Sequence, residues 1–84
     1  MALPVTFKLY ASLMDYLPAD ARGHEVKLEL PEGTTPIQVL ERFGVPLAEV
    51  HLVLVNGVFV PPSQRDRPLQ PGDVLAAWPA VAGG

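Results

Sequence analysis

The ten prolines constrain this 84-residue chain more than any other feature of its sequence. A proline donates no backbone hydrogen bond, so it interrupts helices and sheet interiors and gathers between regular elements. We therefore expect the elements to lie between the prolines, which occupy positions 4, 18, 31, 36, 46, 61, 62, 68, 71 and 79. A chain of this length seldom carries more than one hydrophobic core, so these short elements form one small domain.

Five segments have strand patterns. Apolar and polar residues alternate over residues 5–10 and 25–30, as in half-buried strands. Residues 51–55 are almost continuously apolar, and Asn56-Gly57, the pair preferred in type I′ turns, predicts that residues 58–60 return antiparallel to them. The turn Pro71-Gly72-Asp73 then begins a last strand over residues 74–78.

The clearest helix signal starts at Thr35, which is an N-cap residue followed by Pro36 at the first helical position and by Gln38, which completes a capping box. The helix is expected over residues 36–43, with Gly44 as its C-cap. A shorter helix with a capping-box-like start at Ser12 should follow residues 5–10, and residues 46–49 should form a single turn. This order predicts an α+β fold: a mixed five-stranded sheet, one main helix on one face, and parallel first and last strands as neighbours.

Composition excludes several classes of function. The chain has no cysteine, which removes disulfides, thiolate metal sites and thiol nucleophiles. Its net charge of −3 with only six lysines and arginines leaves no footprint for nucleic acid or an anionic membrane. The sequence contains no candidate membrane span or signal peptide, so we expect a cytoplasmic protein. His24 and His51 begin strands and are interpreted as surface residues, and no phosphate-binding glycine motif occurs.

The strongest functional signal is the segment Trp78-Pro79-Ala80-Val81-Ala82-Gly83-Gly84. Together with Phe7-Lys8-Leu9-Tyr10-Ala11, Val55-Asn56 and Gly72-Asp73-Val74, it makes the chain resemble the MoaD/ThiS family of ubiquitin-like sulfur carriers, most closely the small subunits of molybdopterin synthase. The usual ending of that family is aromatic-Pro-Pro-Val-x-Gly-Gly. This sequence has Ala80 in place of the second proline.

The resemblance implies a β-grasp domain over residues 1–78 and a flexible tail over residues 79–84. It also implies a carrier that is not itself an enzyme and binds no cofactor or metal. An E1-like enzyme of the MoeB/ThiF type would use ATP to adenylate the carboxylate of Gly84, and a sulfur donor protein would convert it to a thiocarboxylate. A molybdopterin synthase large subunit of the MoaE type would then use that sulfur to make molybdopterin, for a molybdenum or tungsten cofactor.

The remaining site predictions concern partner contacts. Tail insertion into the activating enzyme is assigned to Val81, Ala82 and Gly83, and partner docking to Tyr10, Phe59, Trp78 and Pro79. Trp78 has an alternative place in the core, because a lone tryptophan is often buried. We favour exposure, since Leu75 and Ala77 would then fill the space under the helix.

Three other functions fit the same sequence. The chain could carry sulfur for thiamine, cysteine or tRNA thiolation. It could be a ubiquitin-like modifier that joins Gly84 to a lysine through an isopeptide bond. It could also be a plain interaction module whose terminal glycines are incidental.

Overall fold

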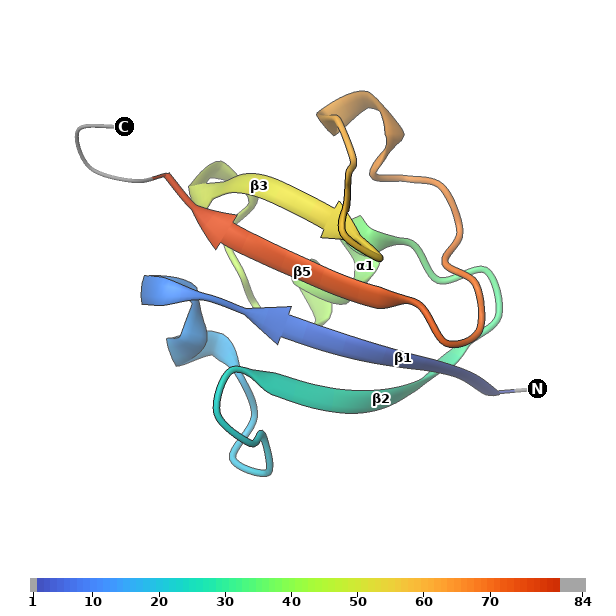
Figure 1. Cartoon of the computed structure of the whole chain (residues 1–84), viewed down its shortest axis with the longest axis horizontal. Helices are drawn as coiled ribbons and strands as arrows, with labels where there is room; N and C mark the ends of the chain where they lie inside the picture. Colours follow the sequence, from blue (N-terminus) through green and yellow to red (C-terminus); the bar gives the residue numbers. More distant parts are fainter. Residues whose placement is uncertain (1, 81–84) are drawn as a thin grey trace.

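Five strands form one mixed sheet in the computed structural model, which describes residues 2–80 of the chain. Their order across the sheet is β2-β1-β5-β3-β4, and β5 lies between β1 and β3 (Figure 1). The strands are β1 (Ala2–Leu9), β2 (Glu25–Pro31), β3 (Val50–Val55), β4 (Val58–Phe59) and β5 (Val74–Pro79). Because β5 runs parallel to β1 and antiparallel to β3, the predicted pairing of the first and last strands is confirmed.

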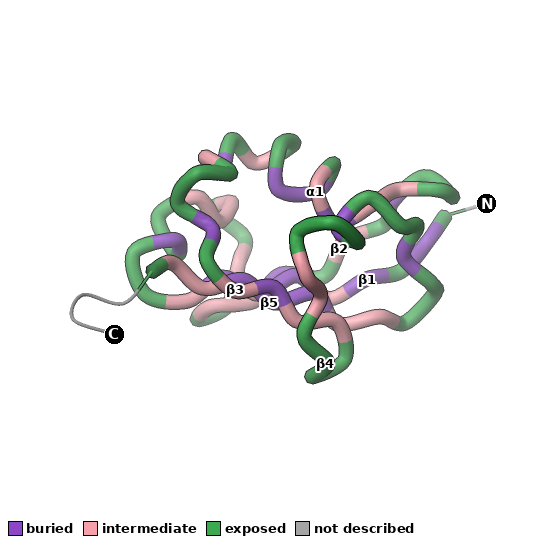
Figure 2. The backbone as a smooth tube through the Cα atoms, turned by 90° about the horizontal axis from the view of Figure 1, so that it is seen from above, coloured by how far each residue is buried: buried purple, intermediate pink, exposed green. Residues whose placement is uncertain are grey.

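The main helix, α1 (Pro36–Arg42), covers one face of this sheet (Figure 2). Three short 3₁₀ helices, η1 (Ala11–Tyr16), η2 (Leu47–Glu49) and η3 (Pro62–Gln64), lie in the connections. The core between α1 and the sheet includes Phe7, Leu9, Leu75 and Ala77 from the strands and Val39 and Leu40 from the helix. The opposite side of the sheet, called the helix-free face below, carries the alternate residues of each strand.

The start of α1 follows the predicted capping box. The backbone N–H of Gln38 donates to the Thr35 hydroxyl oxygen at 3.2 Å, and the Thr35 N–H donates to Gln38 Oε1 at 3.0 Å. These two bonds satisfy donors that a helix start leaves free. The helix ends one residue earlier than predicted, with Phe43 as its C-cap, and Gly44 adopts the expected left-handed backbone at φ +73°.

The β3–β4 hairpin also forms as predicted. Asn56 and Gly57 both have positive φ values, +55° and +80°, which a type I′ turn requires at its two central residues. The resulting register places Val55 opposite Val58 and Leu54 opposite Phe59.

The prediction that Pro4 lies outside the strands is wrong, because β1 begins at Ala2 and Pro4 pairs with Glu29 of β2. The Thr6 N–H points toward the β5 side, where it donates to the Asp73 carbonyl at 3.0 Å, so the Pro4 nitrogen two residues earlier points the same way. Pairing with β5 starts only at Thr6, so no ladder bond is lost there. The Pro4 carbonyl is still used, since it accepts from the Gly72 N–H at 2.7 Å.

The prediction of a helix capped by Ser12 is also wrong. The segment is the 3₁₀ helix η1, its N-cap is Tyr10, and no side chain caps it. The N–H of Leu13 donates to the Tyr10 carbonyl at 3.1 Å, so the first turn closes before Ser12 could act as a cap. A left-handed Ala11, at φ +53°, turns the chain sharply, and the fully buried Leu13 fixes η1 against the core.

Candidate functional site

The end of β5 positions the segment that the sequence singled out. Trp78 and Pro79 are the last two residues of this central strand, opposite Leu52 and Val50 of β3. Pro79 is half-buried and Ala80 is exposed. Val81, Ala82, Gly83 and Gly84 lie outside the described residues, so their predicted roles, and the predicted flexibility of the tail, stay predictions.

Two of the predicted docking residues meet on the helix-free face. The rings of Tyr10 and Trp78 stack with their centroids 4.2 Å apart and their planes 2° from parallel. Parallel pairing of β1 with β5 places Lys8 beside Ala76, so the residues two positions further along each strand also become neighbours.

A third ring continues this row. His24 lies just before β2, and its imidazole is 4.5 Å from the Tyr10 ring at a tilt of 31°. Its position follows from the antiparallel pairing of β1 with β2, in which the Leu9 N–H donates to the His24 carbonyl at 2.9 Å. Sequence reasoning placed His24 on the surface but did not connect it with Tyr10, because that link depends on strand register. We call His24, Tyr10 and Trp78 the aromatic row.

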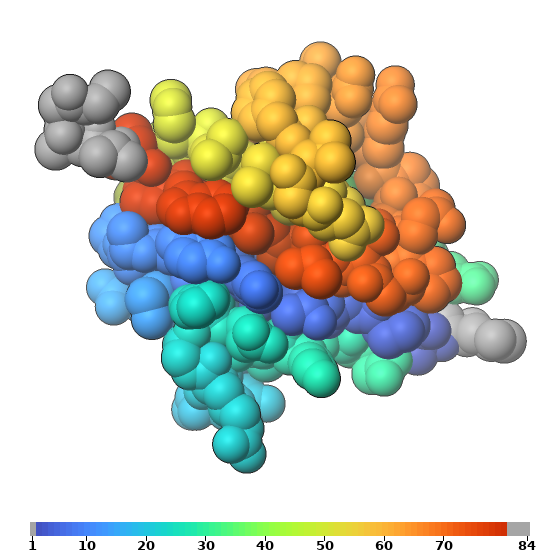
Figure 3. Space-filling view, viewed as in Figure 1, coloured from blue at the N-terminus to red at the C-terminus, as the bar shows by residue number. Residues whose placement is uncertain are grey.

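Apolar side chains extend the aromatic row toward the hairpin. Strand register places Ala76 beside Leu54, Leu54 beside Phe59, and Leu52 beside Trp78 on the helix-free face. Phe59 is 52% exposed, whereas Ala76 is only 6% exposed. We call the aromatic row together with Leu52, Leu54, Phe59 and Ala76 the apolar strip. Figure 3 shows this face, on which β5 runs as a continuous band between β1 and β3.

The predicted docking residues are thus divided between two places. Tyr10, Trp78 and Pro79 lie at the end of β5, whereas Phe59 lies on β4, two strands away from β5, at the hairpin. Trp78 is half-buried on the helix-free face, while Leu75 and Ala77 are fully buried under α1. A partner that covers the whole apolar strip would therefore contact the aromatic row at one end and Phe59 at the other.

A hydrogen-bond network fixes the start of β5, and with it the position of Trp78. The side-chain amide of Asn56 donates to Asp73 Oδ1 at 2.8 Å, and Asn56 Oδ1 accepts from the Val74 N–H at 2.9 Å. Asp73 Oδ2 accepts from the Gln70 N–H at 2.8 Å. The sequence predicts Asn56 as a turn residue. The role of its side chain depends on β5 lying beside the turn, because its hydrogen-bond partners are Asp73 and Val74.

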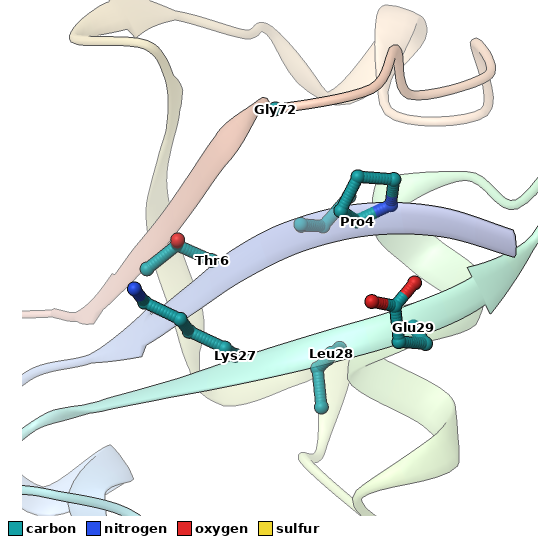
Figure 4. A pocket seen from close by; sticks show the side chains of 7 residues that line it. Pro4, Thr6, Lys27, Leu28, Glu29 and Gly72 are labelled. Atoms are coloured by element: carbon teal, nitrogen blue, oxygen red, sulfur yellow. The ribbon is translucent and has the colours of Figure 1, made fainter.

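Within residues 2–80, no group of three or more histidine, aspartate or glutamate side chains could hold a metal ion. A shallow pocket of about 280 Å³ between β1, β2 and Gly72 presents Thr6, Lys27 and Glu29 (Figure 4). It lies beside the start of β5, at the opposite end of that strand from Trp78.

In the part of the chain that the structure describes, no helix has the length and apolar character needed to cross a membrane.

The fold and this arrangement of β5 define a ubiquitin-like domain. The chain belongs to the Mut7-C ubiquitin family, whose sequence model matches residues 2–83. A solved structure from Pyrococcus furiosus, described as a candidate molybdopterin converting factor, subunit 1, has the same fold with a TM-score of 0.68. The match covers 94% of this chain and 99% of that chain at 24% sequence identity. No curated protein matches the chain.

These findings confirm the predicted ubiquitin-like resemblance and the predicted β-grasp fold.

Proposed function

We propose that this chain is a sulfur carrier in molybdopterin biosynthesis and acts as the small subunit of molybdopterin synthase. The observation that carries the proposal is the ubiquitin-like fold in which β5, held between β1 and β3, ends at Pro79 and leads into residues 80–84, which include Gly83-Gly84. The Pyrococcus furiosus structure with this fold is described as a candidate molybdopterin converting factor, subunit 1, which supports the choice of pathway.

The reacting group of the proposed carrier is the main-chain carboxylate of Gly84. This carboxylate attacks the α-phosphate of ATP on an E1-like enzyme, which releases pyrophosphate and leaves an acyl adenylate. Sulfide released by a donor protein then attacks the acyl carbon and forms a C–S bond, AMP leaves, and the product is a thiocarboxylate. Transfer of that sulfur to a pterin precursor on the large subunit, with water supplying the oxygen, restores the carboxylate. The absence of cysteine from the chain is compatible with this route, because none of its steps needs a thiol on the carrier.

The residues before Gly84 suit insertion into a partner. Gly83 has no Cβ, so foreign backbone can approach it closely and it can adopt dihedrals closed to other residues. Val81 and Ala82 have small side chains that fit a narrow channel. Pro79 has a fixed φ, which lowers the entropy lost when the tail is ordered in the activating enzyme.

The apolar strip is the proposed docking surface for the activating enzyme and the synthase large subunit. Its stacked rings have few rotatable bonds, and the stack already restrains them, so little side-chain freedom is lost on binding. Aromatic side chains of this kind often contribute most of the binding free energy at protein interfaces. The strip also places these anchors beside Pro79, where the tail begins.

Mass spectrometry tests the proposal directly. Intact mass first checks that the purified chain ends with a free carboxylate at Gly84. Incubation with an E1-like enzyme, ATP and a sulfur source should then exchange one oxygen of Gly84 for sulfur. The Gly83→Val variant and deletion of Gly84 should abolish the exchange, whereas Ala80→Val, a matched change at an exposed residue of the same segment, should not.

Other outcomes would change the conclusion. Recovery of Gly84 in isopeptide bonds with lysines, without thiocarboxylate, would indicate a protein modifier. A thiocarboxylate that supplies a thiazole or a tRNA base but not the pterin precursor would retain the carrier and refute the pathway. A chain lacking Gly84 that still delivers sulfur would refute the carrier proposal.

A further inference from the structure

Arg65 is the charged residue that the fold buries within residues 2–80, with 8% of its surface exposed. It follows η3 in the connection between β4 and β5, drawn in orange in Figure 1. A buried arginine normally has a carboxylate or several carbonyls around its guanidinium, because the desolvated cation is otherwise costly.

The guanidinium of Arg65 is only partly satisfied. Its Nε donates to the Val60 carbonyl at 3.1 Å, whereas Nη2 is enclosed and has no hydrogen-bond partner among the described residues. The Arg65 backbone carbonyl accepts from the Ile37 N–H at 3.1 Å, so the residue is also tied to α1. Burial lowers the pKa of the guanidinium from its ordinary value because the cation has lost part of its hydration. It nevertheless remains charged, as arginine does in proteins.

Arg65 lies at a pocket of about 220 Å³ on the α1 side of the molecule. The other residues that line the pocket are apolar and come from α1, η2, β3 and η3: Ile37, Leu40, Leu47, Val50 and Pro62. The volume is below the range of ordinary small-molecule sites and suits a group about the size of one side chain. Apolar walls with one cation at the boundary fit an aliphatic stem that ends in an anion.

We propose that this pocket receives a glutamate side chain of a partner protein, whose carboxylate pairs with Arg65. The planar guanidinium matches a carboxylate in geometry, and their charge-assisted hydrogen bonds are stronger than neutral ones. The methylene groups of a glutamate would contact the apolar wall. A phosphate fits less well, because it would bring a larger charge and no apolar stem into an apolar pocket.

Because Nη2 is enclosed, pairing with it requires a change of side-chain rotamer, which is common when proteins bind. Leu47 and Pro62 are the exposed members of that wall, and Leu47, with 44% of its surface accessible, lies on the three-residue helix η2. The pocket is on the opposite side of the sheet from the apolar strip. The inference therefore does not depend on the proposed sulfur-carrier function, and the two can fail separately.

The test uses a matched pair of probes and the full chain. The protein labelled with ¹⁵N is titrated with N-acetylglutamate amide and, separately, with N-acetylglutamine amide, which differ at the side-chain terminus. We expect the glutamate probe to shift the amide signals of Ile37 and Arg65 saturably, with millimolar affinity, and the glutamine probe to bind about tenfold more weakly or not at all.

Two variants locate the effect. Arg65→Gln should weaken binding of the glutamate probe about tenfold, whereas Arg67→Gln, a matched change at an exposed arginine of the same connection, should leave it within about twofold. Should Arg65→Gln fail to fold, the comparison of the two probes on the unaltered chain still decides the question.

Several results would overturn the proposal. These are equal binding of the two probes, absence of saturable shifts at Ile37 and Arg65, or equal effects of the two arginine variants. A free aliphatic acid such as valerate that binds where the glutamate probe does not would also refute a glutamate side chain as the occupant.

Discussion

The network that joins the hairpin turn to β5 yields a prediction that can be worked out bond by bond. Asn56 makes two side-chain hydrogen bonds, with Asp73 and with the Val74 N–H, and Asp73 makes two, with Asn56 and with the Gln70 N–H. One bond is shared, so the pair makes three in total. Each is worth about 1 kcal/mol net in a partly exposed setting.

The expected changes follow from these counts. Asn56→Gly and Asp73→Ala should each lower the free energy of unfolding by about 2 kcal/mol, and the double variant by about 3 kcal/mol. The double-mutant cycle should therefore return a coupling energy of about 1 kcal/mol, which is the shared bond. Glycine is the suitable replacement for Asn56, because it accepts the φ of +55° without strain.

Urea unfolding gives the free energy of unfolding of the unaltered chain, the two single variants and the double variant. Trp78, the single tryptophan of the chain, provides a fluorescence signal on β5, and circular dichroism checks that both probes follow one transition. The dependence on urea should be the same in all four, so that shifts in midpoint reflect stability alone. A coupling energy below about 0.3 kcal/mol would mean that the bond between Asn56 and Asp73 contributes nothing in solution, and the argument for their role in placing β5 would fail.

Three further predictions concern single features of the fold and the docking surface. Thr35→Ala should cost about 1 kcal/mol of stability in urea unfolding through loss of the helix cap, and Thr35→Ser should restore most of it. Gly57→Ala should lower the free energy of unfolding by about 1–2 kcal/mol because of the backbone φ of +80°, since an added Cβ would meet nothing within 4 Å. Gly57→Asn should lower it less, and equal losses for the two variants would refute this reasoning. Phe59→Ala should weaken binding of the activating enzyme or the large subunit by about 1–3 kcal/mol in calorimetry, whereas Glu41→Ala, at an exposed residue of α1, should not; equal effects would place the docking surface elsewhere.

Local rules account for the elements that were predicted well from sequence. The helix start at Thr35-Pro36 and the turn at Asn56-Gly57 depend on a few adjacent residues whose side chains or dihedrals favour one local structure. The alternation in β1 and β2 fixed which residues face the core, because neighbouring side chains on a strand point to opposite faces. The same argument put Trp78 on the face opposite Leu75 and Ala77, where the structure has it.

The errors arose where a distant part of the chain decided the outcome. Pro4 is accommodated inside β1 because β5 begins only opposite Thr6, which a local rule against proline cannot know. The segment after β1 formed a 3₁₀ helix with no side-chain cap because Ala11 turns the chain and Leu13 is buried against the core.

The sequence by itself determined the positions of most strands, the main helix and the hairpin, and it marked residues 79–84 as the segment of interest. These features are encoded in residue spacing and in local backbone preference, which act over a few positions. Only the tertiary structure decided that His24 joins Tyr10 and Trp78 in one row, that Asn56 binds Asp73, and that Arg65 is buried with an unpaired Nη2. The first two depend on which strands are neighbours and in what register, and the third depends on how the connection after η3 packs against α1. In all three, burial and pairing are set by contacts between segments apart in the chain.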